Sequence, residues 1–350
     1  MKSKNYPENI IKVFKNSGFV LSEPDVLLDS DYIIERSGEN FRRLMLSFED
    51  DSGKSMCLRP DLTVASCIKY LKNNSKANSK IYYSGQAYRR SNNAKDNVVN
   101  DQLGIEILGS KNKSADDLKV IKTVATSIER IKIKNTSIKV GDVSLFKNLI
   151  NSLKIPERWK MRLKRHFWRP HYFEDLLRRL ETNSDVDPVS VELDKKRFSE
   201  MKNIDQNKEV AKRKFSEILS RFDRKIKDPR SFKENKKTVK IIRDFLKINC
   251  SVSQVEKTLK NFVKKNNLDK NFFKDLSKMK NLTKINSNTT FSTNFGRNIE
   301  YYTGVVFHIY NSSKKEIARG GRYDDLLKSL GSKKNIPAVG AAINLNNLKK

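Results

Sequence analysis

The first 145 residues alternate between helical and strand patterns of apolar side chains. Near the start, Ile10, Ile11 and Phe14 recur at helical spacing, and Gly18 is placed to end the predicted helix. The pattern therefore predicts that the chain folds from its first residues.

A β-hairpin and a capped helix come next. LMLSFED (44–50) and SMCLRP (55–60) predict two strands joined by the turn DSGK. Residues 61–73 have helical spacing, and Asp61 is suited to cap that helix. Two further strands, a helix and another strand are predicted at residues 81–90, 103–110, 115–131 and 137–146.

The pattern changes in the middle of the chain, where helix follows helix from about residue 148 to 282. Strand patterns return in TTFSTNF (289–295) and YYTGVVFHIY (301–310), and a helical pattern follows in RYDDLLKSLG. The sequence thus predicts an α+β fold. Its core is discontinuous, residues 1–147 and 283–350, and a helical insertion occupies residues 148–282.

Composition narrows the class of protein. Apolar residues make up 37% of the 350 residues and charged residues 32%, as in a folded globular protein. No apolar run of about 18 residues predicts a membrane span, and the N-terminus has no signal-peptide pattern, so we expect a cytoplasmic protein. The three cysteines lack metal-site spacing and the three histidines do not cluster with them. We therefore expect no metal, no disulfide and no cofactor.

The formal net charge is +31. Residues 151–280 hold 36 basic and 19 acidic side chains, so the middle is about twice as basic per residue as the rest. Such a surface is typical of nucleic-acid binding. Because acidic residues are interleaved and no concentrated basic stripe is present, we interpret it as a lysine-rich surface.

Two stretches carry polar groups suited to a ligand. In CLRPDLT (57–63), Asp61 and Thr63 lie at a strand-to-helix junction, where they suit an ammonium group or simply cap the helix. Gln102 and Glu106 lie on one face of a predicted strand because side chains alternate. They could form a small polar pocket for a cationic or imidazole ligand, or face solvent.

A third stretch, GRNIEYYTGVVF (296–307), brings the paired tyrosines Tyr301 and Tyr302 into a strand. Taken alone, it predicts either an aromatic core strand or the wall of a pocket.

In this order, RPDLT, QLGIEILG, RNIEYYTGVVF, ARGGRYDDLLKSLG and IPAVGAAINL resemble the histidyl-tRNA synthetases, which are class II aminoacyl-tRNA synthetases. The resemblance covers residues 1–145 and 283–350. It implies a six-stranded antiparallel sheet flanked by helices, a homodimer formed through the first motif region, and a histidine pocket.

The resemblance also implies which residues line that pocket. Asp61 and Thr63 fall where the synthetases hold the amino group of histidine. Arg89 falls on the motif 2 arginine, and Gln102 and Glu106 fall on positions that contact histidine. The arginine and the two tyrosines that complete the pocket match Arg297, Tyr301 and Tyr302.

Other positions depart from the synthetase pattern. The last motif of the synthetases ends Gly-Leu-Glu-Arg, and its arginine holds an ATP phosphate, whereas Asn347 stands there in this chain. An asparagine cannot replace a guanidinium at a phosphate site. The motif 2 glutamate and the adenine-stacking aromatic align with Ser91 and Asn100. The sequence also leaves no room for an anticodon-binding domain, so we expect no catalytic residues and no aminoacylation.

A chain of this length with RPDLT resembles the ATP phosphoribosyltransferase regulatory subunits of histidine biosynthesis. WKMRLKRHFWRPHYF (159–173) resembles the insertion of some members. This resemblance implies a non-catalytic subunit that forms a hetero-oligomer with a short-form catalytic phosphoribosyltransferase, is required for its activity, and allows feedback inhibition by L-histidine. Whether histidine acts through this pocket or through the partner stays open.

The alternative is a divergent histidyl-tRNA synthetase paralogue that binds RNA or forms an aminoacyl-adenylate. The basic insertion favours it, and Asn347 opposes it. We expect only weak tRNA binding that disappears near physiological salt, since counterions compete for phosphate contacts. A scaffold with an empty pocket would leave Gln102, Glu106 and the two tyrosines without a role.

Overall fold

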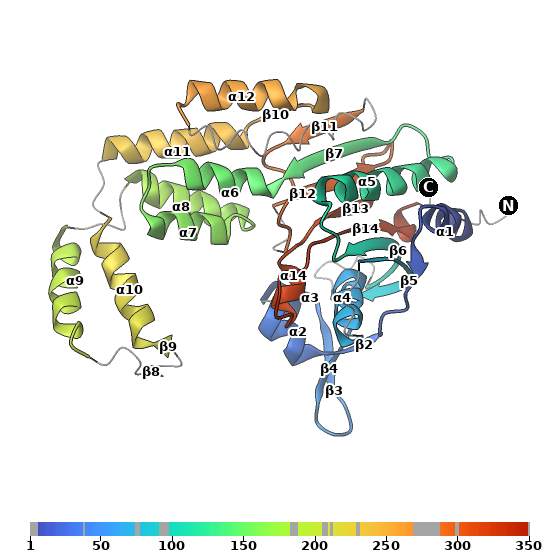
Figure 1. Cartoon of the computed structure of the whole chain (residues 1–350), viewed down its shortest axis with the longest axis horizontal. Helices are drawn as coiled ribbons and strands as arrows, with labels where there is room; N and C mark the ends of the chain where they lie inside the picture. Colours follow the sequence, from blue (N-terminus) through green and yellow to red (C-terminus); the bar gives the residue numbers. More distant parts are fainter. Residues whose placement is uncertain are drawn as a thin grey trace.

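The computed structural model describes residues 6–37, 39–73, 78–90, 98–182, 188–204, 209–210, 213–228, 232–268, 288–297 and 301–348. Within these residues, the centre of the protein is a nine-stranded mixed sheet with helices on both faces and a group of helices beyond one edge (Figure 1).

The strands of this sheet come from distant parts of the chain. In spatial order they are β1 (Val20–Leu21), β5 (Ser79–Tyr88), β6 (Val99–Leu108), β14 (Ala338–Asn344), β13 (Glu316–Arg322), β12 (Val305–Tyr310), β7 (Ser137–Asp142), β11 (Thr289–Ser292) and β10 (Asn249–Ser251). The six strands from β5 to β7 are antiparallel to their neighbours. This stretch confirms the expected six-stranded antiparallel sheet. β1 and β11 extend it in parallel, and β10 adds an antiparallel edge.

The side chains of strand β6 alternate between the two faces of the sheet. Leu103, Ile105 and Ile107 are buried on the face covered by α1 (Tyr6–Asn16) and α5 (Lys113–Arg130). Gln102, Gly104 and Glu106 alternate with them and point to the face covered by α4 (Leu62–Lys72). The predicted alternation along this strand therefore places the two polar side chains on one face.

The N-terminal helix and the hairpin form as predicted. In α1, Ile10 and Phe14 are fully buried, and Gly18 adopts φ +83°, a left-handed conformation suited to a helix end. The hairpin strands lie in a separate three-stranded sheet, β2 (Leu27–Asp29), β4 (Ser55–Leu58) and β3 (Leu46–Glu49), beside α2 (Ser30–Ser37) and α3 (Glu39–Leu44).

The middle of the chain is mainly helical. Its elements are α6 (Val143–Ser152), α7 (Glu157–His166), α8 (Pro170–Thr182), α9 (Pro188–Met201), α10 (Phe215–Ile226), α11 (Phe232–Leu246) and α12 (Val255–Lys265), with the two-residue strands β8 (Glu209–Val210) and β9 (Arg213–Lys214) and the 3-10 turn η1 (Val252–Gln254). Figure 1 shows α9 and α10 projecting from the far end of this group. A short helix, α14 (Leu326–Ser329), and the turn η3 (Leu345–Asn347) complete the C-terminal part. No helix in the described ranges is long and apolar enough to cross a membrane.

Three predictions about elements need correction. The strand predicted at residues 301–310 begins at Val305, so Tyr301 and Tyr302 precede it. The strand predicted at residues 137–146 ends at Asp142, because the Asp142 carboxylate accepts a hydrogen bond from the Ser144 amide at 2.8 Å and caps α6. The run of helices predicted from about residue 148 to 282 also contains the short strands β8, β9 and β10, and β10 pairs with β11 at the sheet edge. The boundaries at residues 147 and 283 stay a prediction, and 283 lies outside the described residues.

A buried ionic network fastens α5 to the end of β13. The Arg322 guanidinium donates to the carboxylates of Asp117 and Asp324, each at 2.8 Å, and to the Lys113 carbonyl at 2.9 Å. Arg322 is only 5% exposed. Burial raises the pKa of Asp117 to about 6, although Arg322 acts to lower it. The carboxylates at this site therefore depend on the guanidinium.

We predict that Arg322→Met lowers the free energy of unfolding by about 3–5 kcal/mol, because it leaves the buried carboxylate of Asp117 without its cation, whereas Asp324 keeps Lys113 at 2.6 Å. Urea unfolding at pH 7.5 measures the loss. Arg130→Met, at an exposed position on the same helix α5, is the control and should change stability by less than about 0.5 kcal/mol. A loss below about 1 kcal/mol for Arg322→Met would contradict the role of the network.

Candidate functional site

The centre of the candidate site is the fully buried carboxyl group of Glu106 on β6. Thr63 donates its hydroxyl to Oε1 at 2.7 Å, and Tyr83 donates to the same oxygen at 3.2 Å. Tyr323 donates to Oε2. Because a buried polar group without partners is costly, these three hydroxyls make the position of Glu106 possible.

Glycines on neighbouring strands provide the space that these side chains occupy. A Cβ atom on Gly340 would lie 1.3 Å from Glu106 Oε2, and one on Gly104 would lie 2.3 Å from the Tyr83 ring. A Cβ atom on Gly321 would lie 2.8 Å from the Tyr302 ring. Glycines inside strands often mark such close approaches. Their positions fix where the polar side chains lie on the sheet.

The pKa of Glu106 is raised to about 8, chiefly by burial. The Asp61 carboxylate adds to the rise, whereas the hydroxyl donors of Tyr323, Thr63 and Tyr83 oppose it. At neutral pH the carboxyl group is therefore mainly protonated, and it can accept and donate hydrogen bonds. Such a group can pair with an imidazole ring and become ionised when it takes up a cationic one.

Asp61 has two functions at the start of α4. One oxygen, Oδ1, accepts from the amides of Thr63 and Val64 and caps the helix, as expected. The other, Oδ2, lies 3.2 Å from Arg89 Nη2, and Arg89 Nε donates to the Pro60 carbonyl at 2.7 Å. The helix cap and the ion pair thus hold Asp61 and Arg89 together near Glu106.

The two predicted tyrosines lie beside this group. The ring centroids of Tyr301 and Tyr302 are 5.0 Å apart, and that of Tyr301 lies 5.9 Å from Tyr323, the donor to Glu106. Gln102, which shares the face of Glu106, makes no hydrogen bond with another described residue, so its amide is available to a ligand. Seven of the eight predicted residues therefore converge on one side of the sheet.

Arg297 is the eighth, and its contacts lie elsewhere. Its guanidinium carbon lies 4.8 Å and 4.9 Å from the ring centroids of Phe167 and Phe173, which belong to the helical middle of the chain. Its Nη1 donates to Asn294 at 2.7 Å, and its buried Nε has no partner in the described part of the chain. Burial lowers the pKa of Arg297 to about 10.

Sequence reasoning missed Tyr83 and Tyr323, which complete the hydrogen bonding of Glu106. Tyr83 lies directly opposite Gly104, and Tyr323 follows β13, so only the pairing of strands brings them to the site. Gly104 could have indicated Tyr83, because a glycine between two polar residues on one strand face leaves room for a large side chain from the neighbouring strand.

The asparagines near the C-terminus support the sheet. Asn346 accepts from the Asp101 amide at 3.2 Å and donates to the Val99 carbonyl at 3.2 Å, so its side chain pairs with β6. Asn347 donates to the Glu316 carbonyl at 2.7 Å on β13. The position aligned with the synthetase phosphate clamp is therefore used for a backbone contact. Of the other two departures, Ser91 lies outside the described residues, and Asn100 lies on β6 opposite Ala87.

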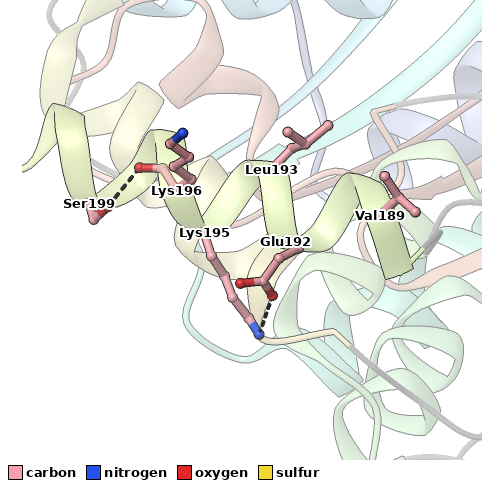
Figure 2. Close-up of a pocket in the computed structure, with 6 residues that line it drawn as sticks. All are labelled: Val189, Glu192, Leu193, Lys195, Lys196 and Ser199. Carbon is pink, nitrogen blue, oxygen red and sulfur yellow. Dashed lines mark hydrogen bonds and ion pairs between the residues drawn. The ribbon is translucent and has the colours of Figure 1, made fainter.

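No group of three potential metal ligands is found in the described ranges. A separate hollow lies on α9, lined by Val189, Glu192, Leu193, Lys195, Lys196 and Ser199 (Figure 2). Lys195 pairs with Glu192 at 3.1 Å within this hollow. It contains none of the predicted site residues.

The antiparallel core and the polar groups on its α4 face define a protein with the class II aminoacyl-tRNA synthetase fold. The histidyl-tRNA synthetase family model matches residues 2–348, and the chain belongs to that family.

Similar proteins agree with this assignment. The ATP phosphoribosyltransferase regulatory subunits of Brucella anthropi and Brucella ovis are each 27% identical to this chain, over 94% of it and 92% of their own length. This confirms the predicted resemblance to such subunits.

Solved structures show the same fold. A Bacillus halodurans protein described as an ATP phosphoribosyltransferase regulatory subunit/histidyl-tRNA synthetase superposes with a TM-score of 0.66, at 17% identity over 98% of this chain and 77% of that one. The Nostoc histidyl-tRNA synthetase has a TM-score of 0.64, at 17% identity over 98% of this chain and 69% of that one.

We predict that protonation of Glu106 makes stability depend on pH. Between its ordinary pKa of 4.5 and about 8, the unfolded chain releases the proton while the folded chain keeps it. The free energy of unfolding should therefore fall as pH rises, by up to about 1.4 kcal/mol per pH unit. Glu106→Gln, which cannot ionise, should lack this contribution.

Urea unfolding at pH 5, 6, 7 and 8 compares the two proteins. Glu49→Gln, at an exposed position on β3, is the control and should follow the wild type. If the free energy of unfolding changes with pH equally in the wild type and in Glu106→Gln, Glu106 is already ionised in the folded protein and the prediction is wrong.

Proposed function

We propose that this chain is a non-catalytic regulatory subunit of ATP phosphoribosyltransferase and serves the first step of histidine biosynthesis. The observation that carries the proposal is the similarity to subunits of that name along nearly the whole chain. The contacts of Asn347 support it, since the residue at the expected position of the ATP-phosphate clamp binds a backbone carbonyl instead.

The proposed partner is a short-form catalytic phosphoribosyltransferase, with this chain as a homodimer inside the hetero-oligomer. Six exposed apolar side chains between residues 20 and 48, in and beside the first-motif region, support the dimer, because an interface would bury them. They are Val20, Leu21, Val26, Leu27, Leu44 and Phe48.

L-histidine is the proposed effector, bound by Asp61, Thr63, Arg89, Gln102, Glu106, Tyr301 and Tyr302, with Arg297 as a further candidate. Glu106 offers a buried partner for an imidazole nitrogen, and Gln102 offers an amide that no other described residue binds. Feedback through this pocket is a coupling free energy between two sites, typically about 1–3 kcal/mol, and it must be reciprocal.

The alternative proposal is a histidyl-tRNA synthetase paralogue that forms an adenylate or binds RNA. The basic middle of the chain favours it, as does the family assignment. The loss of an arginine at position 347 opposes it, because a guanidinium at a phosphate supplies charge that an amide lacks.

We predict no ATP–pyrophosphate exchange in the presence of histidine. Removing a donor to developing charge commonly costs about 3 kcal/mol, or about a hundredfold in rate. Asn347→Arg alone should also be inactive, since Ser91 and Asn100 still replace the groups that hold adenine in synthetases. A bacterial histidyl-tRNA synthetase is the positive control, and exchange at a comparable rate would favour the alternative.

We predict that Glu106→Ala weakens histidine inhibition of the phosphoribosyltransferase complex about ten- to a hundredfold. The reason is that a buried imidazole N–H left without an acceptor costs about 1–3 kcal/mol. The measurement is a histidine titration of phosphoribosyltransferase activity. Assembly and uninhibited activity should persist, because the proposed interface residues lie elsewhere.

Glu129→Ala, an exposed change on α5, is the control and should leave inhibition unchanged. An identical inhibition curve for Glu106→Ala, with no heat of histidine binding to the wild type, would place the feedback site on the partner.

A further inference from the structure

Arg319 lies on the same face of the sheet as Glu106, at the middle of β13. Gly340 pairs with both Glu106 and Gly321, and paired residues direct their side chains to one face. Arg319 is two residues from Gly321, so it points to that face too. It was not among the residues predicted from sequence.

Glu316 holds the guanidinium of Arg319 by one edge. Its Nε lies 3.6 Å from Glu316 Oε1, and the other oxygen of Glu316 lies 2.7 Å from His308 Nδ1. The two terminal nitrogens make no hydrogen bond within the described ranges, and the side chain remains 34% exposed. Glu316 thus anchors one edge of the guanidinium and leaves the other available.

The surroundings of Arg319 connect it to the candidate site. It interacts electrostatically with Tyr302, Tyr301 and Asp61, three of the residues predicted to line the pocket. Its cross-strand neighbour toward β6 is Ala342, whose small side chain leaves space over the sheet. The free edge of the guanidinium is therefore close to the group around Glu106.

We propose that Arg319 binds the α-carboxylate of the amino acid whose side chain is held at Glu106. This inference rests on the proposed histidine pocket and names a residue that sets its specificity. Two strand spacings separate β6 from β13, about 10 Å, and Arg319 is offset along the strand by about 7 Å. The Cα atoms of Glu106 and Arg319 are then about 12 Å apart, a distance that their two side chains and one bound amino acid can span.

The charges around Arg319 suit a carboxylate better than a polyphosphate. Asp61 and Glu316 lie near it, and both repel a multiply charged anion. A single guanidinium offers two parallel N–H groups to a carboxylate, a geometry that lysine cannot reproduce. The site therefore matches a zwitterion, with cationic groups near the acids and its carboxylate on the arginine.

The test compares L-histidine with L-histidinamide, which lacks the carboxylate. Calorimetry uses the full chain, alone and in complex with the catalytic subunit, as wild type, Arg319→Met and Arg319→Lys. The wild type should bind histidine about ten- to a hundredfold more tightly than the amide. Arg319→Met should lower histidine affinity to that of the amide and leave amide affinity unchanged, and Arg319→Lys should fall between.

Arg165→Met, on the exposed side of α7, is the control and should keep the preference for histidine. Thermal unfolding checks that each variant is folded. If Arg319→Met retains the wild-type preference, the inference fails while the histidine pocket stands. If the wild type binds neither ligand, the proposed pocket fails and the inference with it. Competition by millimolar inorganic phosphate, abolished in Arg319→Met, would instead make this a phosphate site.

Discussion

The carboxyl group of Glu106, buried in the middle of the sheet, sets the conditions that the surrounding structure must meet. A buried carboxyl group requires partners for both oxygens, and they come from α4, β5 and the residue after β13. It also requires room, which the missing side chain of Gly340 provides. Three segments far apart in sequence must therefore pack in one register before this group is stable, so the fold and the site form together.

The C-terminal asparagines support the sheet at the position expected to hold a phosphate in the synthetases. The side chain of Asn346 offers a carbonyl and an amide to β6, as a neighbouring strand would, and Asn347 does the same for one carbonyl of β13. These contacts need short, neutral amides. A guanidinium that reached for a phosphate would leave them unmade. Support of the central strand β13 and the binding of a nucleotide phosphate would thus compete at position 347.

Local patterns were sufficient to predict much of the fold. The spacing of Ile10 and Phe14, the hairpin, and the alternation that puts Gln102 and Glu106 on one face depend on neighbours in sequence, and the structure contains all of them. Contacts that depend on strand order were not accessible. Tyr323 reaches Glu106 across 217 positions, and Arg319 joins the same face only because β14 lies between β6 and β13. The three-residue strand β10 is too short to leave an alternating pattern.

Arg297 ties the segment before Tyr301 to the helical middle of the chain, and its hydrogen bond and ring contacts do not involve the residues around Glu106. Resemblance assigned this arginine to the pocket, yet its guanidinium packs against Phe167 and Phe173, beside α7 and within α8. Phe146 of α6 stacks on Phe167 at 3.7 Å, so the arginine contacts a packed aromatic group instead of one mobile ring. A shift of α7 and α8 would therefore change the surroundings of this cation, which lies four positions before Tyr301 in the sequence.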